Sequence, residues 1–170
     1  IITVEDPIEY QIPGILQTQV KESEGYTFAT ALRSLLRQNP DILMIGEIRD
    51  AETAEIAIQA ASTGHLVLST LHTNSAAGVV SRLTAMGVRS DDLANAANLF
   101  MAQRLVRKIC THCTVSVLPT PAQREVIEKA LQSLPEKETL FKEMRLSSGT
   151  GCSHCSGTGF SGQIIISETL

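Results

Sequence analysis

The chain has 170 residues, of which 43% are apolar and 19% are charged, with a formal net charge of −4 and no tryptophan. This length accommodates one sizeable domain, or one domain with a small appendage. An acidic balance argues against a nucleic-acid domain, which normally presents a basic face. The local cluster Arg104, Arg107 and Lys108 is therefore interpreted as a solvated helix face.

No apolar run approaches the ~20 residues that a bilayer crossing requires, and no signal peptide is visible. The chain starts without methionine, directly on an apolar run that is typical of a buried strand. We therefore expect an internal or carboxy-terminal piece of a longer protein.

The first segments alternate between extended and helical patterns. Residues 1–5 form a short apolar run, and the polar stretch 11–25 is interpreted as a loop or a hairpin. From Thr27 the apolar residues follow helical spacing. That helix is expected to end at Asn39, because the residue before a proline is disfavoured in helical geometry.

A second strand and its helix follow. Residues 42–45 are continuously apolar, which predicts a strand that is covered on both faces. Asp50 is the expected N-cap of a helix over residues 51–61, and Gly64 suits the carboxyl end of that helix. Residues 65–70 form the next strand candidate.

Two further helices are predicted before the first cysteine. Asn74 is the expected cap of a helix that runs to Met86, and Ser90 is the expected cap of a longer helix through about Lys108. Strand and helix alternation of this kind predicts an α/β domain whose sheet is mainly parallel, with flanking helices.

Acidic residues and histidines stand where the predicted strands end. Glu5 and Asp6 follow the first strand, Glu47 follows the second and His72 follows the third. Ligands bind beyond the carboxyl ends of the strands in an open parallel sheet. A carboxylate after a strand and a glycine, as at Glu47, can hold Mg²⁺ through water or orient an attacking water. The pattern predicts one shared cleft for a metal ion and a nucleotide.

Simpler interpretations of the charged residues remain open. Glu5 and Asp6 can simply cap the turn that follows the first strand. Arg49 can contact a phosphate, or it can pair with Asp50 or Glu52. Glu47 is harder to explain by local structure alone.

The two histidines of the third strand are not equivalent. His72 lies at the carboxyl end and is the preferred phosphate sensor, whereas His65 starts the strand at the other end. His65 would serve the fold or a subunit contact unless the chain curves. The phosphate-loop pattern G-x-x-x-x-G-K-[ST] is absent from the 170 residues. We therefore expect the chain by itself not to hydrolyse nucleotide efficiently.

Two Cys-x-x-Cys pairs form the most specific local pattern. Zinc takes four tetrahedral ligands, and each pair supplies two of them from one tight turn. The pairs are Cys110 with Cys113 and Cys152 with Cys155, with 38 residues between the second and third cysteines. A thioredoxin-like redox pair is the alternative. His112 and His154, inside the pairs, are not expected to be ligands.

The segment between the pairs contains a predicted helix, with Thr120 before a proline at its first position. We interpret it as an insertion between two zinc knuckles. Its apolar stripe is expected to be ordinary core packing: Val126, Ile127, Ala130, Leu131 and Leu134. Glycines that crowd around the second cysteine pair imply tight turns.

Long sequence blocks carry a family resemblance. They are ITVEDPIEY, LRQNPDILMIGEIRDAETAEIAIQAASTGHLVLSTLHTN and AQRLVRKIC, and the similarity resumes at GCSHCSGTGF. The chain resembles the secretion ATPase superfamily, in particular its type II secretion and type IV pilus assembly branch. The four-cysteine element is similar to that of the assembly and secretion branches and is lacking in pilus-retraction motors.

The resemblance implies a RecA-like fold and a set of site residues. Residues 1–109 would be the carboxy-terminal part of the ATPase core, residues 110–160 a zinc subdomain and residues 161–170 a tail. The catalytic group would be the Walker B glutamate Glu47, assisted by Glu5. The expected nucleotide contacts are Asp6, Arg49, His65 and His72.

The resemblance also implies cofactors and partners. These are ATP, Mg²⁺ and Zn²⁺, a homohexamer, and an inner-membrane platform protein beneath which the motor docks from the cytoplasm. ATP hydrolysis would drive pilin or pseudopilin assembly, with no direct nucleic-acid partner. The alternatives are a DNA-uptake or conjugation motor and a non-catalytic zinc-bearing assembly module. The tail departs from the family pattern at Ser161, Gln163 and Ile165.

Overall fold

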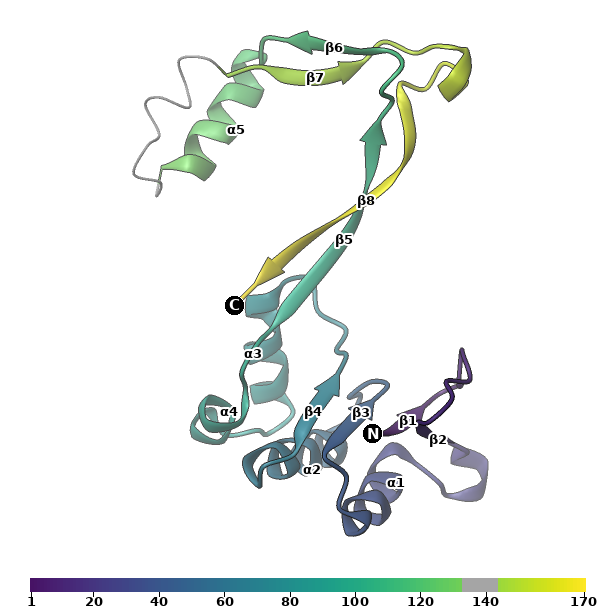
Figure 1. Ribbon diagram of the computed structural model, residues 1–170. Helices are drawn as coiled ribbons and strands as arrows, with labels where there is room; N and C mark the ends of the chain where they lie inside the picture. Colours follow the sequence, from purple (N-terminus) through teal and green to yellow (C-terminus); the bar gives the residue numbers. More distant parts are fainter. Residues whose placement is uncertain (133–143) are drawn as a thin grey trace. The chain divides into compact units, whose positions relative to one another are not determined.

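The computed structural model describes residues 1–132 and 144–170. They divide into two compact units (Figure 1). The first unit contains residues 1–103 and 167–170, and the second contains residues 104–166. These compact units do not define domain boundaries. The predicted division into residues 1–109, 110–160 and 161–170 therefore stays a prediction.

A four-stranded parallel sheet forms the centre of the first unit. Its strands are β1 (Ile2–Glu5), β2 (Leu16–Gln19), β3 (Ile42–Ile45) and β4 (Leu66–Ser69), in the order β2-β1-β3-β4. All three neighbouring pairs run parallel. The predicted α/β class is therefore confirmed, and the residues that follow β1, β3 and β4 come to the same edge of the sheet.

Helices α1 (Phe28–Leu35) and α2 (Ala51–Ser62) lie against one face of this sheet, as Figure 1 shows. Leu43 and Ile45 are fully buried, whereas Met44 between them is 37% exposed. Side chains alternate between the faces of a strand. The prediction that β3 is covered on both faces is therefore wrong for the described residues.

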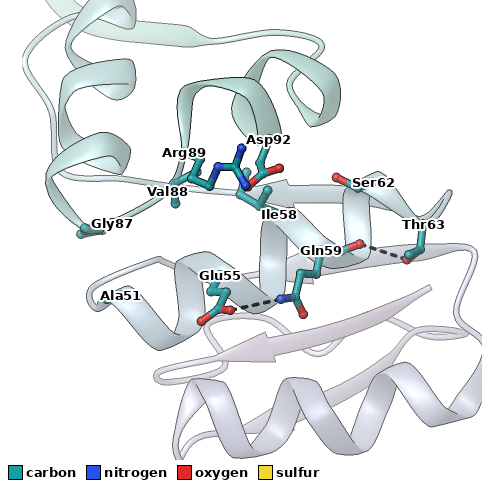
Figure 2. A pocket seen from close by; sticks show the side chains of 11 residues that line it. Ala51, Glu55, Ile58, Gln59, Ser62, Thr63, Gly87, Val88, Arg89 and Asp92 are labelled. Carbon is teal, nitrogen blue, oxygen red and sulfur yellow. Dashed lines mark hydrogen bonds between the residues drawn. The ribbon is translucent and has the colours of Figure 1, made fainter.

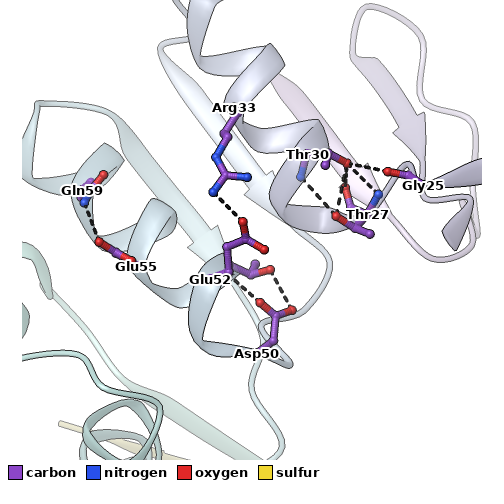
Figure 3. A network of polar contacts seen from close by, with 9 residues as sticks. Gly25, Thr27, Thr30, Arg33, Asp50, Glu52, Glu55 and Gln59 are labelled. Atoms are coloured by element: carbon purple, nitrogen blue, oxygen red, sulfur yellow. Dashed lines mark hydrogen bonds and ion pairs between the residues drawn. The ribbon is translucent and has the colours of Figure 1, made fainter.

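The helix starts follow from local capping chemistry. Thr27 accepts a hydrogen bond from the Thr30 amide and forms a capping box at α1. Asp50 Oδ1 accepts from the Thr53 amide at 2.8 Å, and its other oxygen accepts from the Thr53 hydroxyl at 3.0 Å. Figure 3 shows both caps and the ion pair of 2.5 Å between Arg33 on α1 and Glu52 on α2. The predicted cap of α2 at Asp50 is confirmed, whereas the cap of α1 at Thr27 was not predicted.

Two elements differ from the prediction in the first unit. The stretch 11–25 contains strand β2 and a short 3-10 helix, η1 (Glu22–Glu24), rather than only a loop or hairpin. Its strand pairs parallel with β1, a long-range contact that a polar sequence does not reveal. A second short 3-10 helix, η2 (Leu36–Gln38), ends at Asn39 in left-handed geometry.

The long helix predicted from Ser90 to Lys108 is wrong. Helix α3 (Ala76–Ala85) is capped by Ser75 rather than Asn74, and α4 (Ser90–Ala96) is short. Strand β5 (Met101–Ile109) follows and pairs with the distant strand β8 (Phe160–Thr169) in a two-stranded sheet. Tertiary pairing overrides helical spacing here, so the basic cluster near Lys108 lies on a strand.

The second unit combines a hairpin-like ladder, a helix and a glycine-rich turn. Strands β6 (Thr114–Val117) and β7 (Leu146–Gly149) pair antiparallel, and η3 (Ser153–Cys155) is a 3-10 turn. Helix α5 (Pro121–Leu131) starts at Pro121 with Thr120 as its cap, as predicted. None of its residues is buried, and Val126 is 68% exposed. The expected core packing of its stripe is wrong for the described residues, and Leu134 lies outside them.

Glycines are needed where two backbones meet beside the cysteines. A Cβ on Gly149 would overlap the backbone of Gly159, and Gly151 and Gly157 both have positive φ angles. The predicted tight turns are confirmed. Within the part of the chain that the structure describes, no helix combines the length and apolar character needed to cross a membrane.

We expect Asp50→Ala to lower the free energy of unfolding by about 1–2 kcal/mol, because α2 loses its N-cap. The buried Thr53 hydroxyl would also lose its acceptor. Asp91→Ala is the matched control, since this exposed carboxylate meets only Arg89 at 3.5 Å. Urea unfolding followed by circular dichroism measures both variants, and equal midpoints would contradict the prediction.

Candidate functional site

Four predicted residues come together at the carboxyl edge of the sheet. Glu47, directly after β3, accepts a hydrogen bond from Arg49 at 2.6 Å through Oε1. Its Oε2 lies 3.0 Å from His72 Nε2, beyond β4. Arg49 also reaches Asp6, beyond β1, at 3.3 Å. The side chains form a continuous chain from Asp6 to His72 across three strand ends.

The backbone next to Glu47 is hydrogen-bonded to β1 on one side and to the residue after β4 on the other. The Gly46 amide donates to the Val4 carbonyl at 2.7 Å, and the Gly46 carbonyl accepts from the Thr70 hydroxyl at 2.7 Å. A Cβ on Gly46 would lie 3.1 Å from the Val4 oxygen. Glycine therefore lets β1 approach here more closely than a larger residue would.

The electrostatics of this edge favour an ionised glutamate. The Arg49 hydrogen bond, assisted by His72, lowers the pKa of Glu47 from its ordinary value of 4.5, against the opposing effect of burial. The same interaction raises the pKa of Arg49. The Glu47 side chain is only 16% exposed, whereas His72 is 86% exposed. Glu47 is thus a largely buried, negatively charged group that faces a solvent-accessible imidazole.

Arg49 does not make the ion pairs that its sequence neighbours suggested. Asp50 instead caps α2, and Glu52 pairs with Arg33. The partners of Arg49 are Glu47 and Asp6, and only the tertiary fold brings Asp6 within reach.

Glu5 has a different environment from Glu47. Its carboxylate accepts from the Thr3 hydroxyl at 2.5 Å and from Gln17 Nε2 at 2.9 Å. Gln17 also donates to the Tyr10 carbonyl and accepts from the Ile12 amide, so it organises the loop after β1. Sequence reasoning missed Gln17. Residues 17–19 are all polar, so the sequence carries no apolar alternation that would have indicated its place on a strand.

His65 lies at the opposite end of β4 from His72. Its Nδ1 is 3.0 Å from the Ala60 carbonyl at the end of α2 and 3.3 Å from the Thr63 hydroxyl. At ~3.3 Å per residue, the four residues of β4 separate the two histidines by more than 10 Å. The structure thus groups His72, and not His65, with Glu47. A role for His65 in nucleotide binding stays a prediction.

Two cavities lie near helix α2. One of about 720 Å³ lies between α2 and the turn before α4, where Glu55, Gln59, Arg89 and Asp92 line it (Figure 2). None of the strand-end residues lines it, so we do not assign the nucleotide to it. The other, of about 460 Å³, runs along β4 and includes Thr70 and Ile48, which adjoin the strand-end residues.

The four cysteines form one cluster in the second unit. All four Sγ atoms lie within 4.8 Å of one another. Cys110 and Cys152 are 4.0 Å apart, and Cys113 and Cys155 are 3.9 Å apart. Four thiolates around one tetrahedral zinc, with Zn–S near 2.3 Å, stand about 3.8 Å apart. A disulfide requires about 2.05 Å. The cluster therefore fits a metal ion better than a redox disulfide.

Backbone amides prepare one of these sulfurs for a metal ion. The amides of Cys152 and Gly159 donate to Cys155 Sγ at 3.3 and 3.2 Å. These bonds lower the pKa of Cys155 to about 6, whereas burial raises the pKa of Cys113 to about 11. The His112 and His154 rings stack with centroids 4.1 Å apart, outside the sulfur cluster. That neither histidine is a ligand stays a prediction.

The chain is similar in fold to solved structures of a pilus retraction motor and of an ATPase. Its structural neighbours include the pilus retraction motor PilT with bound ADP, at a TM-score of 0.57 and 30% identity. This match covers 86% of the chain and 49% of PilT. The ATPase DotB of Legionella pneumophila is similar at a TM-score of 0.53 and 27% identity, over 85% of the chain and 44% of DotB. The class that this fold defines is the secretion ATPase fold.

Sequence comparison identifies the family. The model of the Type II/IV secretion system protein family matches residues 1–170, so the chain belongs to this family. The chain is 51% identical to the type IV pilus assembly ATPase PilB of Thermus thermophilus, over 99% of the chain and 18% of that protein. It is 48% identical to the type II secretion system ATPase E of Vibrio cholerae, over all of the chain and 32% of that protein. The chain thus spans between about a fifth and a third of these relatives.

We expect Arg49→Ala to raise the pKa of Glu47 towards 4.5, because the largest stabiliser of its ionised form is lost. A lowered folded-state pKa stabilises the protein above the unfolded pKa and ceases to do so as pH falls through the folded one. The stability advantage of the unmodified protein should therefore be fully present at neutral pH, decline as pH falls below about 4.5, and vanish below the lowered pKa of Glu47. Carbon-13 NMR titration of the glutamate carboxyls measures the shift.

Arg33→Ala is the control for this titration, since Arg33 pairs with Glu52 on the surface. It should leave the Glu47 titration unchanged. An unchanged Glu47 titration in the Arg49 variant would show that Arg49 does not hold this carboxylate in solution.

Proposed function

We propose that the chain forms part of an ATP-hydrolysing motor that drives pilin or pseudopilin assembly in type IV pilus biogenesis or type II secretion. The observation that carries the proposal is the contact between Glu47 and His72 across two strand ends, bracketed by Arg49 and Asp6. Family membership over the whole chain and the similarity to pilus assembly ATPases support it.

Glu47 is the residue suited to orienting the attacking water. It is ionised, and its two oxygens contact Arg49 and His72, one oxygen each. A carboxylate oxygen accepts two hydrogen bonds, so a lone pair on each remains for a water. That water attacks the γ-phosphorus, the bond from phosphorus to the bridging oxygen breaks, and the water proton passes to solvent or phosphate.

The neighbours of Glu47 have complementary roles in this scheme. His72, exposed at the edge, can contact the γ-phosphate and report its loss to Glu47 through their hydrogen bond. Arg49 holds the Glu47 carboxylate and is aligned by Asp6. Mg²⁺ would be held through water by Glu47, with Glu5 assisting, and would supply positive charge against the charge that develops on the phosphate.

The remaining parts of the machine lie outside these 170 residues in this proposal. A phosphate-binding loop would come from another part of the protein, because the chain contains no G-x-x-x-x-G-K-[ST] pattern. The motor would be a homohexamer at the cytoplasmic side of the inner membrane, docked on a platform protein. His65 would act in the histidine box from the far end of β4.

We further propose that the metal ion of the cysteine cluster is zinc with a structural role. Four sulfur ligands leave no open coordination position for catalysis. The second unit has few buried side chains, with Cys110 fully buried and Cys155 6% exposed. A small module of this kind commonly depends on its metal to fold.

Glu47→Gln in the intact protein should abolish ATP turnover and preserve ATP binding, because a neutral amide orients and polarises the attacking water far less well than a carboxylate does. Steady-state phosphate release and equilibrium ATP binding measure the two properties. Glu55→Gln is the control, since this exposed carboxylate contacts only Gln59 at 3.2 Å. Undiminished turnover in the Glu47 variant would contradict the assignment of Glu47 as the residue that orients the attacking water. A protein that never turns over ATP would favour the non-catalytic assembly module.

Cys110→Ser should lower the zinc content below one ion per chain and destabilise the second unit, since one of four ligands is lost. Metal analysis by mass spectrometry and proteolysis of the second unit provide the measurements. Cys113→Ser should behave alike, because all four sulfurs share one cluster. Full zinc occupancy in both variants would contradict the site.

A further inference from the structure

The hydroxyl of Thr70, just after β4, makes a contact that the neighbouring hydroxyls of Ser69 and Thr73 do not make. Thr70 Oγ1 donates to the Gly46 carbonyl at 2.7 Å, a contact between residues 24 apart in sequence. In contrast, Ser69 donates to the adjacent Thr70 carbonyl at 3.4 Å, and Thr73 donates to the nearby Ser75 carbonyl. Only the Thr70 hydroxyl of these three reaches another strand.

Thr70 is hydrogen-bonded to the residue before Glu47 and to the residue after it. Its hydroxyl holds the residue before Glu47, and its carbonyl accepts from the Ile48 amide, after Glu47, at 3.0 Å. The ladder between β3 and β4 ends with Ile45 opposite Ser69. The Thr70 contacts therefore extend the connection beyond the regular ladder, to the point where the site begins.

Both backbone hydrogen-bonding groups of Gly46 are consequently engaged. Its amide is fixed by the Val4 carbonyl of β1 and its carbonyl by the Thr70 hydroxyl beyond β4. Fixed peptide groups before and after Glu47 set the direction of its Cα–Cβ bond relative to the sheet. Arg49 and His72 then need to fix only the side chain.

We propose that Thr70 is a positioning residue for ATP hydrolysis, which acts by pinning the backbone around Glu47 through its hydroxyl. This inference rests on the proposed role of Glu47. Catalytic groups must be held within a fraction of an ångström of their working geometry, and their supporting contacts are what hold them there. Thr70 touches neither the carboxylate nor, in this proposal, the nucleotide.

The test is Thr70→Val in the intact protein, with phosphate release measured over a range of ATP concentrations. Valine keeps the branched shape and the backbone carbonyl but removes the hydroxyl. We expect kcat to fall by about tenfold or more, since small displacements of a catalytic group are costly. We expect KM for ATP to stay within about twofold, because the contact does not serve ground-state binding.

Two further variants separate positioning from general stability. Thr70→Ser restores the hydroxyl and should recover most of kcat. Thr84→Val is the matched control, because Thr84 also donates its hydroxyl to a carbonyl, that of Val80 in its own helix at 2.9 Å. It should leave kcat unchanged. If valine at Thr70 prevents folding, Thr70→Ala takes its place in the same assays.

Glu47→Gln distinguishes the two levels of the proposal. If Glu47→Gln abolishes turnover while Thr70→Val has a normal kcat, the Thr70 inference is wrong and the function stands. If Glu47→Gln turns over normally, the proposed function itself fails.

Discussion

The strand ends of a parallel sheet coincide only when the register of the strands is fixed, and the candidate site depends on this constraint. Val4 stands opposite Ile45, and Ile45 stands opposite Ser69. Residues that follow these positions therefore reach one edge from segments far apart in sequence. A shift by one residue would turn the side chains of a strand to its other face, and Glu47 would no longer meet His72.

The rigidity of that edge comes from contacts at different levels. Gly46 permits the close approach of β1, which a side chain would oppose. The Thr70 hydroxyl donates to the Gly46 carbonyl, and Asp50 caps α2 shortly after the site. The carboxylate of Glu47 then lies between a cation and an imidazole, which together keep it ionised. Backbone contacts thus set the place of the group, and side-chain contacts set its charge.

The second unit is organised by a different principle. It has little apolar core, and the helix between its cysteine pairs buries no side chain. Its order instead depends on sulfur atoms that converge within 4.8 Å and on glycine backbones that touch beside them. A metal ion would supply the binding energy that apolar burial does not provide. The two units therefore call for different tests, nucleotide turnover for one and metal content for the other.

The sequence by itself determined the features that depend on neighbouring residues. These include the cap at Asp50, the start of α5 at Pro121, and the pairing of cysteines in tight turns. Because alternating strands and helices form parallel sheets, the sequence also placed Glu47 and His72 at one edge. Only the tertiary structure decided which residues touch there. Arg49 met Asp6 and not Asp50, Glu5 turned to Gln17, and residues 101–109 became a strand, because each depends on partners remote in the chain.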